Sequence, residues 1–447
     1  MNLTGKSPTF RKQRSHSDPY RILILLGMLI TSLFLLRAVQ QDEIQSPFMP
    51  TPIPTRTAYS YSQEADSHFY AGNLNKAIQA YQQAVASDPG NAELWAELAR
   101  VQAYSSVLLT TDQEKRERLQ EALDSINKAV EANEFSSTAH AVRAFVLDWN
   151  SNPILSGDQQ QTLLTEAEQS AVRALQLDNQ NTLALVYYAE ILVDQKKWLQ
   201  ASQYINQALE QDSTLMDVHR VNAYVQETLG NYGAAINEYK TATQIMPNMT
   251  FLYINIGVNY RQLKQYEIAL EYFAKAADIN EQLGVEDPIP YIAIGKTYSQ
   301  MGEFFIAGRN TRKALEINPY NPDVYGSLGM VYYKSRNYEG AIETLKCAVK
   351  GCNAEETCKV IKGDVCTAEE ISESSPISGM PLSGSTVVYY YTYGSALAGM
   401  ARPYNDYCEE AVQVLKEVRT QFSDEPVILQ IVQTSEEICA TFGYTSR

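Results

Sequence analysis

The chain is poor in the residues that most enzymes use for catalysis. Its 447 residues include only four histidines, His16, His68, His140 and His219, and these are scattered along the sequence. It contains no P-loop, no nucleophile elbow and no pair of histidines at metal-binding spacing. We therefore predict no catalytic residue, no cofactor and no metal site.

Positive charge is also scarce over most of the chain. There are 36 Lys and Arg against 52 Asp and Glu, which gives a formal net charge of −16. Residues 1–37 carry six of the basic residues and one acid, so the other 410 residues carry about −21. A body this acidic repels phosphate backbones, which argues against a nucleic-acid partner.

Charged residues are absent from 22–36, ILILLGMLITSLFLL, and the apolar character extends past Arg37 to Val39. Eighteen helical residues span ~27 Å, close to the ~30 Å of a bilayer core. The basic flank predicts a cytoplasmic N-terminus and an exported body. We predict an uncleaved transmembrane signal anchor at 22–39. A cleaved signal peptide is the alternative, although LLRAVQQDE offers no good cleavage site.

A proline-rich stretch follows the apolar segment. Residues 46–57, SPFMPTPIPTRT, alternate proline with Thr and apolar residues. Such a sequence favours polyproline II and cannot pack as helix or sheet. We predict a spacer between the anchor and the body.

Residues 58–355 repeat with a period of 34 residues, which is the signature of a helical repeat array. Small residues recur at positions 8 and 20 of each unit, and a large residue recurs at position 24. In two neighbouring units these are Ala223 and Gly257, Ala235 and Ala269, and Tyr239 and Phe273. The small residues let two helices of a hairpin approach closely. One hairpin cannot bury its own apolar faces, so neighbouring units must stack.

This pattern resembles the tetratricopeptide repeat family, firmly over 58–355 and loosely over 387–441. Two units have inter-helix turns that we predict to be lengthened, by residues 105–120 and 150–160. The resemblance implies an all-α, right-handed superhelical solenoid of about nine helix-turn-helix units, preceded here by one transmembrane helix. It also implies a concave face, lined by the first helix of each unit, that holds a peptide or a partner protein.

In the family, positions 2, 5, 9, 12 and 13 of the first helix usually face this groove. Apolar residues stand at its centre and basic ones at its rim, which suits an apolar peptide or helix. Alternatively, these side chains contact only neighbouring parts of the same chain. The candidate partner-binding residues are Arg220, Tyr224, Phe251, Ile254, Val258, Arg261, Ile292, Lys296, Met330 and Tyr333.

The six cysteines all lie after residue 346. An even, clustered set on an exported body predicts disulfides. Zinc is an alternative, but there is no C-x-x-C pair and no nearby His; reduced cysteines in a cytosolic protein are another. Cys408 and Cys439 should pair, because the helix ends that carry them meet when consecutive helices run antiparallel. The other four, which can pair in three ways, are Cys347, Cys352, Cys358 and Cys366.

The sequence thus favours a non-catalytic scaffold, anchored by one helix in the cell membrane, that binds a protein or peptide outside the cytoplasm. An accessory subunit of a cell-envelope enzyme or assembly complex is the alternative, and an enzyme with its site in the insertion is a third possibility. The predicted segments are a basic tail (1–21), the anchor (22–39), a Pro/Thr-rich linker (40–57), about eight repeats (58–355), a Cys-bounded polar insertion (356–386), and a degenerate repeat with a capping helix (387–447).

Overall fold

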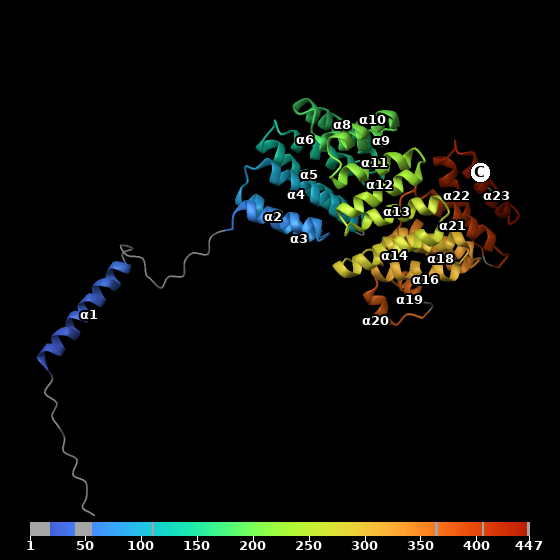
Figure 1. Ribbon diagram of the computed structural model, residues 1–447. Helices are drawn as coiled ribbons and strands as arrows, with labels where there is room; N and C mark the ends of the chain where they lie inside the picture. Colours follow the sequence, from blue (N-terminus) through green and yellow to red (C-terminus); the bar gives the residue numbers. More distant parts are fainter. Residues whose placement is uncertain (1–17, 41–55, 110, 363–364, 405, 445–447) are drawn as a thin grey trace, which may run out of the picture. The chain divides into compact units, whose positions relative to one another are not determined.

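The computed structural model describes residues 18–40, 56–109, 111–362, 365–404 and 406–444. The chain divides into two compact units, Met1–Arg56 and Thr57–Arg447 (Figure 1). The predicted basic tail lies mostly outside the described residues, as does most of the predicted linker.

The described residues of the first unit form the helix α1 (Pro19–Gln40). Its stretch Pro19–Ala38 has a mean hydropathy of 2.0 and is long and apolar enough to cross a membrane. The helix includes the predicted anchor and begins three residues before it. Whether it crosses a membrane stays a prediction.

The second unit is an all-α solenoid of stacked helical hairpins, as predicted (Figure 1). Nine hairpins follow one another, and a last helix caps the stack. The hairpins are α2 (Ala58–Tyr70) with α3 (Leu74–Ser87), α4 (Ala92–Ser105) with α5 (Asp112–Ala132), α6 (Ser137–Asn150) with α8 (Gln160–Leu177), α9 (Thr182–Asp194) with α10 (Trp198–Gln211), α11 (Met216–Thr228) with α12 (Tyr232–Ile245), α13 (Thr250–Gln262) with α14 (Tyr266–Leu283), α15 (Ile289–Met301) with α16 (Phe304–Ile317), α17 (Pro322–Lys334) with α18 (Tyr338–Val349), and α21 (Val387–Met400) with α22 (Cys408–Gln421). The cap is α23 (Pro426–Ala440).

The prediction of long inter-helix loops in the second and third hairpins is wrong for most of their length. Thr111 and Glu114 form a reciprocal capping box that starts α5 at Asp112, because the side chains satisfy the first free N–H groups of the helix. In the third hairpin, the loop folds into α7 (Pro153–Ser156) and the 3₁₀ turn η2 (Gly157–Gln159) before α8. The extra residues therefore add helical turns.

The Cys-bounded insertion is also more ordered than its polar composition predicts. It contains most of α19 (Ala354–Lys362) and all of α20 (Ala368–Glu373). Its strand β2 (Ile377–Ser378) pairs in antiparallel register with β1 (Gly351–Cys352), which lies just before it. The structure pairs Cys347 with Cys352 and Cys358 with Cys366. Val360 and Ile377 pack into the core of the neighbouring repeats.

The last two helices bring the predicted C-terminal cysteine pair together. Cys408 begins α22 and Cys439 lies near the end of α23, and their Cα atoms are 5.3 Å apart in a disulfide. Both side chains are fully buried. The helices α22 and α23 therefore run antiparallel, as the prediction of this cysteine pair assumed.

The first half of the solenoid bends until its two ends meet. The turn between α2 and α3 contacts the loop between α12 and α13, where the Asn248 Nδ2 donates to the Ala71 carbonyl over 3.1 Å. Gly72 in this turn has φ +76°, and a Cβ there would lie 2.8 Å from the Asn248 carbonyl oxygen. Glycine is thus required both by the left-handed backbone and by the close approach. The 34-residue period does not predict this closure, because a repeat period describes only neighbouring units.

Gly257 marks a close approach of α13 and α14, as its repeat position predicts. A Cβ at this position would lie 2.5 Å from a ring carbon of Phe273, which is itself fully buried. The side chains at positions 8 and 24 therefore share one fixed space between the helices.

We expect Gly257→Leu to overpack this contact and to destabilise the fold by about 1–3 kcal/mol. The damage should concentrate in α11–α16, because repeats mainly stabilise their neighbours. Amide hydrogen exchange on the full chain in detergent would locate it. Gly233→Leu is the control, since a Cβ at Gly233 meets nothing within 4 Å. Equal exchange in both variants would contradict this close packing.

Candidate functional site

A cavity of about 620 Å³ opens on the concave side of the first half of the solenoid. The first helices of four successive hairpins, α6, α9, α11 and α13, contribute to its wall. The turns added to the second and third hairpins provide another part, through Lys115 and Leu119 of α5 and through Asn152, Pro153 and Leu155. The additional turns of these two hairpins, which were predicted as loops, therefore form part of the cavity wall.

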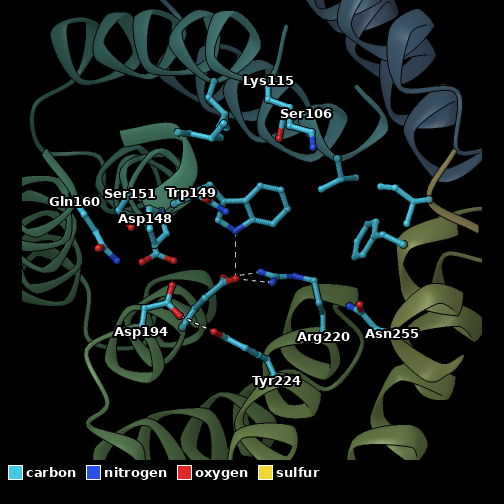
Figure 2. A pocket seen from close by; sticks show the side chains of 18 of the residues that line it. Ser106, Lys115, Asp148, Trp149, Ser151, Gln160, Asp194, Arg220, Tyr224 and Asn255 are labelled. Carbon is cyan, nitrogen blue, oxygen red and sulfur yellow. Dashed lines mark hydrogen bonds and ion pairs between the residues drawn. The ribbon is translucent and has the colours of Figure 1, made fainter. Parts of the chain in front are cut away.

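Glu190 and Arg220 form the central ion pair of the cavity (Figure 2). Arg220 donates from both terminal nitrogens to the two carboxylate oxygens of Glu190, each over 2.6 Å. The Trp149 Nε1 donates to the same carboxylate over 3.2 Å. Both charged side chains are only 7% exposed. This bidentate geometry fixes the orientation of both side chains.

Asp148 and Asp194 lie beside this pair, and their carboxylates face each other on one side of the cavity (Figure 2). Asp194 is exposed and accepts a hydrogen bond from the Tyr224 hydroxyl over 2.6 Å. Asp148 is 3% exposed. Burial, and next the charge of Asp194, raise the pKa of Asp148 well above its ordinary value. This side of the cavity therefore has an excess of acid.

Behind the cavity, the carboxylate of Asp217 joins α4 to α11. It is completely buried and pairs with Arg100 of α4. It also accepts hydrogen bonds from the hydroxyls of Tyr104 and Tyr187, the latter over 2.8 Å. Burial alone would raise the pKa of Asp217, but the guanidinium groups of Arg100 and Arg220 outweigh burial and lower it to about 2.

Aromatic rings fill the space between these charges. Phe145 and Tyr187 stack with their centroids 4.6 Å apart, and Tyr104 and Phe251 stack at 6.0 Å. The Arg220 guanidinium lies over three rings, at 5.6–5.7 Å from their centroids. The concave face of this half is therefore packed with its own side chains, and the cavity is what remains open.

Three of the predicted partner-binding residues, Arg220, Tyr224 and Phe251, line the cavity. Arg220 donates hydrogen bonds to Glu190, and Tyr224 donates one to Asp194. These two predicted residues therefore contact neighbouring parts of the same chain, as the alternative prediction has it.

The other predicted residues lie outside the cavity. Ile254 and Val258 pack on the core around Ala293, and Ile292 is only 8% exposed. Arg261 lies over the Phe273 ring and donates to the Ala293 carbonyl over 3.4 Å. These residues therefore present less apolar surface to a groove than their positions imply.

The remaining three lie further along the solenoid. Lys296 is exposed. Met330 packs on the C-terminal core, and the ring of Tyr333 contacts that of Tyr338 edge-on at 5.6 Å. A partner-binding role for any of these positions stays a prediction.

The acidic residues of the cavity are missing from the predicted set, although the repeat register contains them. Counted from Thr182, Glu190 and Asp194 occupy positions 9 and 13 of the fourth unit. In the third unit, Asp148 and Trp149 occupy positions 12 and 13. Extending the groove positions to these two units would have identified them. Within the part of the chain that the structure describes, no group of three or more His, Cys, Asp or Glu is arranged to hold a metal ion.

Replacing Asp217 by Asn should destabilise the solenoid by about 3–5 kcal/mol, because the Arg100 guanidinium loses its fully buried charge partner and keeps only the more exposed Glu97. The contribution of the carboxylate is present above its unfolded pKa of ~4. It is lost as the pH falls through the folded pKa of about 2, because the group is then protonated in both states. The stability difference between wild type and variant should therefore shrink below about pH 4.

Denaturant unfolding of the full chain in detergent at pH 7 and pH 3 would measure both effects. Asp158→Asn is the control, because Asp158 is exposed and outside the cavity, and surface substitutions usually change stability by less than ~0.5 kcal/mol. Equal stability of the Asp217 and Asp158 variants would contradict the role of the buried carboxylate.

Comparison with known proteins agrees with this architecture. Tetratricopeptide repeat models match residues 62–105, 252–283 and 311–343. The BBSome complex member BBS4 of Bos taurus is 30% identical over 117 residues, which are 26% of this chain and 22% of BBS4. The anaphase-promoting complex subunit CDC16 of Saccharomyces cerevisiae is 27% identical over 128 residues, 27% of this chain and 15% of CDC16. The matches thus span about a fifth of the length of these relatives.

Among solved structures, that of the human IFIT1 dimer with PPP-AAAA has a similar fold. Its TM-score is 0.52 and its sequence identity 15%, over 85% of this chain and 83% of that one. At this identity the similarity concerns the fold alone. The chain carries tetratricopeptide repeats and folds as a tetratricopeptide-repeat solenoid.

Proposed function

We propose that this protein is a non-catalytic, membrane-anchored scaffold that binds a protein or peptide partner on the extracytoplasmic side through its concave face. The cavity is the observation that carries the proposal. It is lined by first helices of successive repeats, the surface that repeat solenoids use for binding. Its volume lies within the ~300–1,000 Å³ typical of ligand pockets. BBS4 and CDC16 are named as members of protein complexes, which supports a protein partner.

The membrane and compartment assignments rest on the two ends of the chain. The apolar stretch of α1 follows a basic N-terminal segment, which favours a cytoplasmic N-terminus. The cysteines of the second unit form three close pairs, an arrangement that persists in oxidising compartments.

An accessory subunit of a cell-envelope enzyme or assembly complex is the second candidate. The additional turns that enclose the cavity favour it, because a site built from two modified repeats suits one specific partner.

Protease added to intact cells or spheroplasts should digest residues 58–447 and leave a small N-terminal stub. Alkylation before reduction should label none of the six cysteines, and non-reducing peptide mapping should recover Cys408 joined to Cys439. Cytosolic loading controls must remain undigested in the same samples. A protected body, or free thiols at all six positions, would overturn the extracytoplasmic assignment.

Photocrosslinking tests the binding face itself. We expect p-benzoylphenylalanine in place of Asn255, which lines the cavity, to crosslink to discrete partner proteins in cells. The same group in place of Glu271, exposed on the second helix of that repeat, serves as the control. One stoichiometric product would favour the accessory subunit, and several would favour a general scaffold. Identical products from both positions, or none from position 255, would count against binding through the concave face.

A further inference from the structure

The acidic side of the cavity contains a buried group without a partner. Asp148 is 3% exposed and lines the cavity. Its Oδ1 atom is buried and has no hydrogen-bond partner among the residues that the structure describes. Leaving a buried carboxylate oxygen without a donor is costly. Such a group in a cavity wall is a place where a ligand can supply the missing donor.

The charges around Asp148 indicate the sign of that ligand. Glu190 is neutralised by its bidentate pair with Arg220. In the described part of the chain, neither Asp148 nor Asp194 takes part in an ion pair, and the hydrogen-bond partner of Asp194 is the neutral Tyr224 hydroxyl. The one remaining basic residue of the lining is Lys115, which Figure 2 shows across the cavity from the two acids. The side formed by Asp148 and Asp194, called here the acidic wall, thus lacks a cation.

The rest of the lining suits an organic cation on an apolar stem. Leu119, Leu155 and Phe251 contribute apolar surface. The indole of Trp149 stands beside Asp148, and the Arg220 guanidinium already lies over one of its faces at 5.7 Å. Arg and Lys side chains combine donors at the tip with methylene groups that pack on apolar surface.

We propose that the acidic wall of Asp148 and Asp194 receives the cationic end of an Arg or Lys side chain presented by a peptide segment of the partner. This inference rests on the proposed function, since it specifies the chemistry that the concave face recognises. A guanidinium can donate to both carboxylates at once, and so satisfies the free Oδ1 of Asp148. An anionic peptide end, by contrast, would be repelled here.

Matched peptides test the proposal on the full chain in detergent. The probes are fluorescein-labelled Gly-Leu-Arg-Leu-Gly and the same peptide with citrulline, the neutral isostere of arginine, or with Glu at the centre. Fluorescence anisotropy should show the arginine peptide binding at least ~10-fold more tightly than the citrulline peptide. The Glu peptide should bind more weakly than both. Equal affinities, a preference for Glu, or no binding of any peptide at millimolar concentration would overturn the proposal.

Variants of the acidic wall connect this preference to the residues. The double change Asp148→Asn and Asp194→Asn should weaken binding of the arginine peptide about tenfold and change that of the citrulline peptide less than twofold. Both substitutions preserve side-chain shape. Asp158→Asn, exposed and outside the lining, removes a charge without affecting binding. An arginine preference that survives the double change would also overturn the proposal.

The two proposals fail in different ways. A partner crosslinked from position 255 whose yield is unaffected by the double change would refute the acidic wall and leave the scaffold function standing. Selective binding of the arginine peptide without any partner crosslinked from position 255 would support the acidic wall and contradict the scaffold function.

Discussion

The buried carboxylate of Asp217 fixes the geometry of the first half of the solenoid. It lies on α11, yet its charge partner Arg100 and one of its hydroxyl donors, Tyr104, lie on α4, three hairpins earlier. Removing a carboxylate from water is costly, and this cost is offset only when the counter-charge and the donors are held in position. The structure therefore brings helices together that stacking of neighbours alone would leave apart. The hydrogen bond from Asn248 to Ala71 joins the two ends of the same half of the solenoid.

Closure of the first half of the solenoid changes the surface that its concave face offers for binding. An open superhelix offers a long groove along its first helices, whereas here Tyr104, Phe145 and Tyr187 fill that space. The remaining opening is bounded on the other side by the added turns of α5 and by α7. The binding surface is thus reduced from a groove to one cavity, and its chemistry depends on a few side chains. This explains why an apolar groove, predicted from Ile254, Val258 and Ile292, differs from the acidic cavity of the structure.

Local features of the fold were predictable from the sequence, and long-range ones were not. The 34-residue register identified the hairpins and the close approach at Gly257, because both depend on contacts within one repeat or between neighbours. The capping residues Thr111 and Glu114 were visible in the sequence, and reading them would have corrected the predicted loop. The acidic cavity residues were likewise readable from the register. The pairing of Asp217 with Arg100 was not, because no local pattern relates two residues so far apart in sequence.

Within each half of the second unit, a different kind of contact holds the helices together. One continuous core extends from Ala65 to Ile256, and its closure relies on buried charge and hydrogen bonds. Beyond it the core divides into smaller clusters, and there the structure places all three disulfides. Cys408 and Cys439 are 31 residues apart, so their disulfide restricts the unfolded chain. It also holds α23, a terminal helix that has repeats to stack on from one side only. Apart from Ile289, the residues that line the cavity lie in the half without cysteines, so the geometry of the acidic wall is set by buried ion pairs and packing, with the covalent links acting at the other end of the solenoid.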